Sequence, residues 1–156
     1  MLLQQVFSPG RILVDLQSED KDELFEELVD VLAKEGGRGF PRQGALAAIR
    51  EREAKMSTGI KKGIALPHGK AEGIDGLSGV IGISRRGIEY DALDGQPVYL
   101  VFLILSSPRD SEQHLGVLKR LARLLDDPGF YTDLVGVEAP DRAFEVVKKY
   151  EDHLTL

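Results

Sequence analysis

The sequence contains no cysteine among its 156 residues. This absence excludes a disulfide scaffold, a thiolate metal site and a cysteine nucleophile. Long apolar runs are also missing, because the longest one, residues 98–105, is far shorter than a membrane-spanning helix. The first residues lack a basic stretch followed by an apolar one, so we expect no signal peptide. We therefore expect a cytoplasmic protein without a segment that inserts into a membrane.

Basic residues are fewer than acidic ones. The chain has 20 Lys and Arg against 26 Asp and Glu, which gives a net charge of −6. This balance argues against a general nucleic-acid binder. Hydrophobic residues make up 42% of the chain, which is enough to fill one core at this length. We expect a single domain that spans residues 1–156.

Helix and strand patterns alternate along the chain, which is typical of an α/β fold. Caps and apolar spacing predict helices that begin near Asp20, Pro41, Ser111, Pro128 and Pro140. The helix after Ser111 should face the core with Leu115, Leu118, Leu121, Ala122 and Leu125. We expect strands at 12–16, 63–66, 80–84, 88–90 and 98–105, with residues 85–87 as a hairpin turn. Together these elements predict a mixed sheet of about five strands flanked by helices on both faces.

One histidine follows a predicted strand in an unusual setting. His68 comes directly after Pro67 at the end of the strand at 63–66, where open α/β sheets place their sites. Proline fixes the backbone ahead of the imidazole, and Gly69 removes side-chain bulk behind it. We expect a rigid and accessible ring. For a lone histidine, however, a polar residue that simply ends a strand would be the preferred interpretation.

The residues around His68 are basic although the chain as a whole is acidic. Residues 50–70 contain six basic and two acidic side chains, a net charge of +4. Such a patch suits an anion or a phosphoryl group, and hydroxyls and backbone amides at Ser57, Thr58, Gly59 and Gly63 could add donors. The alternative is a solvated basic loop beside a helix end.

A second histidine is predicted in the first turn of a helix. If Asp110 or Ser111 caps that helix, the free amides and the dipole near His114 favour an anion and keep the imidazole neutral. A neutral ring can donate one hydrogen bond to a phosphoryl oxygen. The alternative is a surface histidine without a role, as we expect for His153 near the frayed end of the chain. No third ligand at metal-binding spacing accompanies the histidines, so we expect no metal site.

These residues occur in a familiar order. Residues 57–60 and 63–69 resemble the active-site signature of phosphotransferase-system (PTS) enzyme IIA domains of the fructose/mannitol type. Arg52, residues 91–98, the strand at 99–105 and residues 112–115 extend the resemblance, which covers roughly residues 13–147. The family fold, a mixed sheet flanked by helices, agrees with the fold expected from the patterns.

The resemblance implies a phosphocarrier without a cofactor. In that family the histidine of the Pro-His pair, here His68, accepts a phosphoryl group from HPr or a nitrogen-branch paralogue of HPr. It passes the group to a IIB domain or uses it as a signal to regulatory target proteins. Arg52 matches the arginine that steadies the phosphoryl group, and His114 matches the second histidine. The expected phosphoryl-binding loop comprises Ser57, Thr58, Gly59 and Lys61.

Lys61 departs from the family pattern, which usually has a small residue, most often glycine, at this place. If the position requires a positive φ, a lysine there costs about 1 kcal/mol. Alternatively, Lys61 adds a charge near the phosphoryl group. The phosphocarrier could be a sugar-uptake component or a regulator of the nitrogen-related branch, and the absence of fused IIB or IIC segments favours the regulator. A protein-interaction module that works without phosphorylation is the alternative from another class.

Overall fold

The computed structural model describes residues 1–154 apart from the side chain of Lys61. The α-helices of this part are α1 (Leu3–Val6), α2 (Lys21–Gly36), α3 (Arg42–Lys55), α4 (Ser111–Leu125), α5 (Pro128–Val135) and α6 (Pro140–Asp152). The strands are β1 (Ile12–Leu13), β2 (Gly59–Lys61), β3 (Ile64–Ala65), β4 (His68–Lys70), β5 (Leu77–Ile88) and β6 (Val98–Ser106). Short 3-10 turns lie at Pro9–Arg11, Gly37–Gly39 and Pro108–Asp110.

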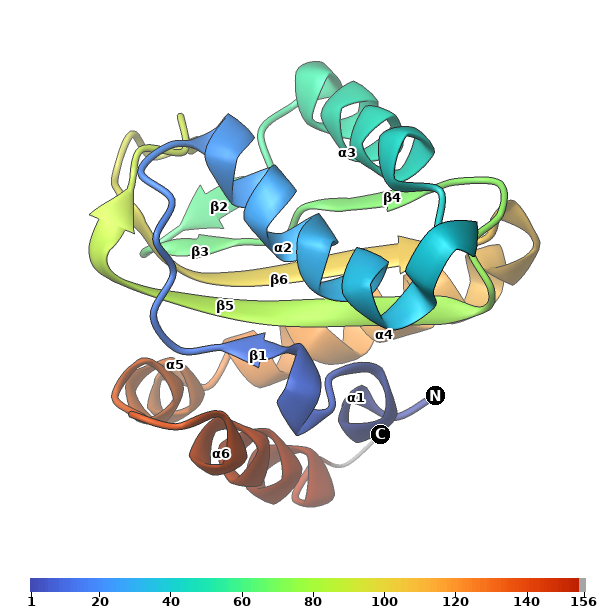
Figure 1. The fold of residues 1–156 in the computed structure, drawn as a ribbon. Helices are drawn as coiled ribbons and strands as arrows, with labels where there is room; N and C mark the ends of the chain where they lie inside the picture. Colours follow the sequence, from blue (N-terminus) through green and yellow to red (C-terminus); the bar gives the residue numbers. More distant parts are fainter. Residues whose placement is uncertain (155–156) are drawn as a thin grey trace.

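The strands form one mixed sheet of six strands (Figure 1). Its order is β1-β5-β6-β3-β2, and β4 pairs with β6 as well. Strand β6 is central, because it runs antiparallel to β5 and parallel to β3 and β4. All of its residues except Tyr99 are buried, which explains the uninterrupted apolar run at 98–105. The expected α/β fold with a mixed sheet is thereby confirmed.

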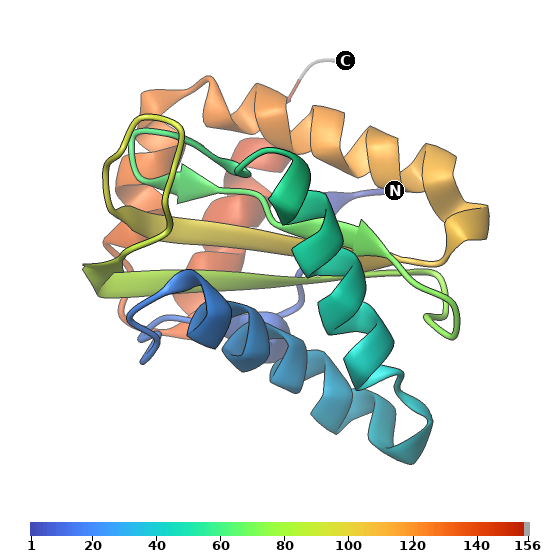
Figure 2. The ribbon, with the colours of Figure 1, turned by 90° about the horizontal axis from the view of Figure 1, so that it is seen from above.

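Helices cover both faces of the sheet (Figures 1 and 2). Helices α2 and α3 lie on one face, where Leu28 and Leu46 join a core with Val101 of β6. Helices α1, α4, α5 and α6 lie on the other face, where Leu121 and Phe130 pack with Phe102. Neighbouring residues of β6 thus serve opposite cores, as the alternation of a strand requires. No helix within residues 1–154 has the length and apolar character to cross a membrane.

The hairpin predicted at residues 85–87 is wrong. Strand β5 continues through these residues, and its pairing with β6 shifts register between Ile83 and Ile88. Gly87 has a φ of 90°, and its amide donates to the hydroxyl of Ser84 at 3.0 Å. The turn-forming residues are therefore absorbed as a bulge inside one long strand.

The predicted inner face of α4 is confirmed at Leu121, and Leu118 and Leu125 are partly buried against the same core. The side chains that face the sheet are His114, Val117, Leu121 and Leu124. Two residues predicted to be internal are exposed, namely Ala122 and Leu115, of which Leu115 is 52% exposed. Two rows of leucines lie next to each other on this helix, so the periodicity alone could not choose between them. The buried contact of His114 with the sheet, described below, fixes the rotation of the helix.

Candidate functional site

His68 is the first residue of β4 and pairs with Ile104 of the central strand. Pro67 separates β3 from β4, because it has no amide hydrogen for the ladder, while its carbonyl accepts from the Ile104 amide at 3.0 Å. The histidine therefore begins a second strand, whereas the sequence pattern placed it directly after the end of one. A Cβ at Gly69 would lie 3.0 Å from the backbone of α3, so glycine allows this helix to pack directly against β4.

The tautomer of His68 is set by its own backbone neighbourhood. Its Nδ1 lies 2.8 Å from the carbonyl oxygen of Leu66. A carbonyl can only accept, so Nδ1 carries the hydrogen and the lone pair is on Nε2. Burial lowers the pKa of His68, with a smaller contribution in the same direction from the positive charge of Arg52. The half-buried ring is therefore held neutral, with Nε2 as its nucleophilic atom.

His114 lies against the His68 ring from the other side of the site. The two ring centroids are 5.5 Å apart in an edge-to-face arrangement. Its Nδ1 is 2.7 Å from the hydroxyl of Ser106 at the end of β6, whereas its buried Nε2 has no hydrogen-bond partner within residues 1–154. Burial and then the proximity of His68 lower the pKa of His114 to about 4. When the Ser106 hydroxyl donates to Nδ1, the unpartnered Nε2 carries a hydrogen that it can donate to a bound anion.

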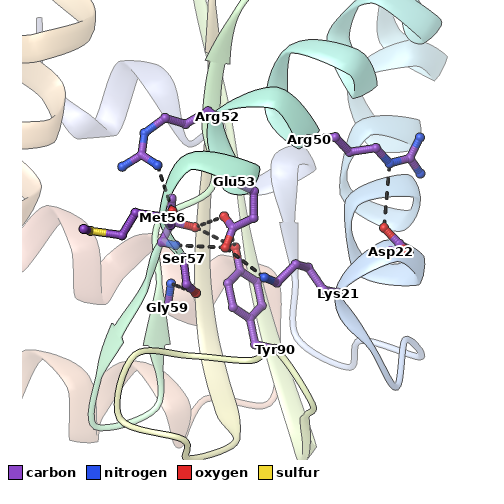
Figure 3. Close-up of polar contacts among 10 residues, drawn as sticks. Lys21, Asp22, Arg50, Arg52, Glu53, Met56, Ser57, Gly59 and Tyr90 are labelled. Atoms are coloured by element: carbon purple, nitrogen blue, oxygen red, sulfur yellow. Dashed lines mark hydrogen bonds and ion pairs between the residues drawn. The ribbon is translucent and has the colours of Figure 1, made fainter.

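Arg52 completes the group from the last turn of α3. Its Nη1 donates to the carbonyl of Met56 at 2.8 Å (Figure 3). A hollow of about 280 Å³ is lined by Ala48, Glu51, Arg52, Lys55, His68, Gly69, Lys70 and His114. An adjoining hollow of about 360 Å³ shares both histidines and continues along α4. The structure thus brings the three predicted residues, Arg52, His68 and His114, around one space.

The electrostatics of this space favour an anion. Arg52, Lys55 and Lys70 line the first hollow, where Glu51 is the acidic side chain among the lining residues. A guanidinium can bind two oxygens of a phosphoryl group at once, and two neutral imidazoles add a nucleophile and a donor. No group of three His, Cys, Asp or Glu side chains in the described part of the chain is arranged to hold a metal ion. The arrangement is suited to receive a phosphoryl group on His68.

The predicted phosphoryl-binding loop has a different geometry. Ser57, Thr58 and Gly59 line neither hollow. The Ser57 hydroxyl accepts from the Gly59 amide at 3.1 Å, and Thr58 is buried with its hydroxyl bonded to Glu53 at 2.6 Å. A Cβ at Gly59 would lie 2.7 Å from Tyr90, so this glycine is required for close packing. Thr58 and Gly59 therefore support the packing around the site, and a phosphoryl-binding role of this loop stays a prediction.

Lys61 lies in β2, where its backbone pairs with Ile64, and its side chain is outside the described residues. The positive φ angles of this hairpin occur at Lys62, with 53°, and Gly63, with 83°. Two consecutive residues of positive φ are typical of a two-residue hairpin turn. The lysine in the left-handed region is thus Lys62 and not Lys61.

Glu53 is a residue of this region that the sequence reasoning missed. Its carboxylate accepts from the amide of Thr58 at 2.9 Å and lies 3.2 Å from the donating hydroxyl of Tyr90. Burial alone would raise the pKa of Glu53, but hydrogen bonds from Thr58 and the contact with Lys21 hold it below its ordinary value. A signal was present, because Glu53 follows Leu46 and Ile49 at the spacing of the buried face of α3.

The sequence is similar to known proteins over nearly its whole length. Residues 5–150 match the model of the family described as "Phosphoenolpyruvate-dependent sugar phosphotransferase system, EIIA 2". The fructose-specific EIIABC component of the PTS of Bacillus subtilis is 32% identical over 151 residues, which are 97% of this chain and 24% of that protein. The chain therefore spans about a quarter of that relative.

Two further similarities cover nearly the whole of both chains. A nitrogen regulatory protein of Pseudomonas aeruginosa is 31% identical over 146 residues, which are 93% of this chain and 94% of that protein. The crystal structure of the nitrogen regulatory protein IIA-Ntr from Neisseria meningitidis superimposes with a TM-score of 0.85 at 27% identity. That match covers 93% of this chain and 98% of the other.

Proposed function

The chain belongs to the EIIA 2 family of the phosphoenolpyruvate-dependent sugar phosphotransferase system, and on this premise we propose that it carries a phosphoryl group on Nε2 of His68. One observation supports the proposal above all others. The Leu66 carbonyl holds Nδ1 of His68 at 2.8 Å, so the nucleophilic nitrogen is the one left for the hollow that Arg52 and His114 also line. Membership in the family implies a phosphocarrier or regulatory role, and this geometry supports Nε2 of His68 as the atom that is phosphorylated.

The transfer of the phosphoryl group from a donor phosphohistidine to His68 uses only groups of the donor protein and of this chain. The lone pair of Nε2 forms a new P–N bond, while the P–N bond to the donor histidine breaks and its electron pair returns to the donor ring. His68 then carries the positive charge that the donor ring has lost. Its Nδ1–H stays bonded to the Leu66 carbonyl, which stabilises this charge. We propose the phosphohistidine of HPr or of a nitrogen-branch paralogue as the donor.

Arg52 and His114 act on the phosphoryl group itself. Phosphoryl transfer depends mainly on positioning and on the neutralisation of charge on the three phosphoryl oxygens. Arg52 supplies a permanent positive charge, and its fork can bind two oxygens. His114, kept neutral by burial, donates one hydrogen bond from Nε2, which satisfies its unpartnered nitrogen.

For the downstream step we propose a regulatory role in preference to sugar uptake. The support is the likeness to nitrogen regulatory proteins from two organisms, one of them with a TM-score of 0.85. The fructose-specific relative supports the other role, in which a IIB domain accepts the phosphoryl group. A transfer assay with purified IIB domains separates the two, because a regulator would keep its phosphoryl group in their presence.

The central experiment is labelling by radioactive phosphoenolpyruvate in the presence of enzyme I and HPr. We expect one acid-labile phosphate per chain in the wild type and none in His68→Ala. The control is His153→Ala, which removes an exposed histidine of the C-terminal segment and should label fully. An unlabelled wild type beside an active IIA control would refute the phosphocarrier and favour a module that acts by protein contacts alone.

A further inference from the structure

We propose that Glu53 and Thr58 are positioning residues, which hold Arg52 in place through the short segment 56–58. The inference rests on the proposed function of Arg52 at the phosphoryl group. It starts from the fact that Arg52 and Glu53 are neighbours in the last turn of α3, with only Arg52 among the residues that line the hollow. Their side chains nevertheless bind the two ends of one three-residue segment, Arg52 at Met56 and Glu53 at Thr58 (Figure 3).

Segment 56–58 leaves the helix abruptly. Met56, the residue that ends α3, has an extended backbone with φ −169° and ψ 135°. Its carbonyl accepts the hydrogen bond from Nη1 of Arg52, and Met56 itself is 60% exposed. An exposed residue with an extended backbone is not fixed by the helix. Whatever holds the far end of the segment therefore determines where the acceptor of Arg52 lies.

Glu53 holds that far end. One of its oxygens accepts from the amide of Thr58 at 2.9 Å, and the other accepts from the Thr58 hydroxyl at 2.6 Å. Both contacts are buried, since Thr58 is 4% exposed and Glu53 is 8% exposed. Charge-assisted hydrogen bonds in such surroundings are stronger than neutral ones at the surface. The two carboxylate oxygens thus bind Thr58 at two points, which fixes both its position and its orientation.

Two further groups hold the carboxylate itself. The ammonium of Lys21 in α2 lies 3.0 Å from one oxygen of Glu53. The hydroxyl of Tyr90, which follows β5, lies 2.7 Å from the hydroxyl of Thr58 and 3.2 Å from Glu53. Elements from three parts of the chain therefore support the segment. We infer that this arrangement keeps the Met56 carbonyl, and with it the Arg52 guanidinium, in the orientation that the transfer requires.

The test uses a pair of substitutions that differ by one hydroxyl. Thr58→Val keeps the shape of the side chain but cannot donate to Glu53, whereas Thr58→Ser keeps the hydroxyl. We expect Thr58→Val to slow single-turnover phosphorylation of His68 about tenfold, because small misplacements of a positioned group reduce the rate strongly. Thr58→Ser should recover most of the wild-type rate.

A double-mutant cycle shows whether the effect passes through Arg52. If Thr58 acts by positioning Arg52, Thr58→Val should cause no further slowing in the Arg52→Ala background. As a readout without transfer, the ¹⁵N resonances of the Arg52 guanidinium should report faster rotation in Thr58→Val than in the wild type. The matched control is Glu151→Gln, a buried carboxylate of α6 outside the site, which should leave both the rate and the Arg52 resonances unchanged.

The outcomes distinguish this inference from the proposed function. An unlabelled wild type would remove the proposed function, and the Arg52 resonances would still test the positioning. A normally labelled wild type with equal rates in Thr58→Val and Thr58→Ser would overturn the positioning role alone. Additive losses in the double mutant would likewise overturn it, because they would mean that Thr58 affects the rate independently of Arg52.

Discussion

Two buried carboxylates, Glu53 and Glu151, bind the same kinds of partner in different regions of the molecule. Each lies near the C-terminal end of a helix, each accepts from a backbone amide, and each pairs with a cation. Glu53 pairs with Lys21 at 3.0 Å and Glu151 pairs with Arg120 at 2.7 Å. A carboxylate at this end of a helix is opposed by the helix dipole, so specific partners must stabilise both of them.

The two carboxylates differ in the segments whose backbone amides they bind. Glu151 accepts from the first two amides of α1, those of Leu3 and Gln4, and so joins the N-terminal helix to α4 and α6. Glu53 accepts from the segment that also holds Arg52. The same chemistry therefore serves assembly in one region and the placement of a charged side chain in the other. Burial and hydrogen bonding of a carboxylate do not by themselves show which of these two roles it has. The role follows from the residues that neighbour the amide it binds.

The largest effect on stability is expected at Glu151, the carboxylate that joins helices. Glu151→Ala leaves Arg120 and two backbone amides without their partner, so the free energy of unfolding should fall by about 3–5 kcal/mol. Urea denaturation measures this loss. Under conditions where the variant is folded, its phosphorylation rate should stay near that of the wild type. A slow but stable Glu151→Ala would show that the two regions are coupled.

At Arg52 we expect a large effect on the transfer rate and a small effect on stability. Arg52→Ala removes the charge that we propose for the phosphoryl group, so transfer should slow by about 10²–10³-fold, as for the loss of one preorganised donor. Stability should change by only about 0.5 kcal/mol, because the side chain is partly exposed and joins no buried cluster. Rapid-quench kinetics and urea denaturation measure the two quantities on the same samples. Near-normal transfer would place Arg52 outside the site.

His114 sharpens the comparison because it is both buried against the sheet and in contact with His68, the residue that we propose as the nucleophile. Folding lowers its pKa from 6.5 to about 4, so between these values the unfolded chain binds a proton that the folded chain does not. Its contribution to stability is complete above pH 6.5 and is lost as the pH falls toward 4, by about 3 kcal/mol in total. His114→Gln should therefore flatten the stability profile in this window. If stability changed with pH in the same way in His114→Gln and in the wild type, the lowered pKa of His114 would be contradicted.

Much of the fold could be predicted from local patterns. The helix start at Asp20 was readable because its side chain caps the amide of Glu23, and the central strand because apolar residues fill both of its faces. The four-residue helix α1 was missed, since its first amides depend on a carboxylate 148 positions away. The bulge in β5 and the burial of His114 in place of Leu115 were misjudged, because both depend on partners in other strands and not on local spacing.

The sequence alone indicated which residues gather at the site, because His68 and His114 each stand in a recognisable local setting and the family resemblance adds Arg52. Only the tertiary structure decided how each of them is held there. The Leu66 carbonyl selects the nitrogen of His68, Ser106 fixes His114, and segment 56–58 orients Arg52. These choices are made by backbone atoms and by contacts between distant segments. Residue types do not encode them, because every residue has a carbonyl and only the packed chain determines which one a side chain meets.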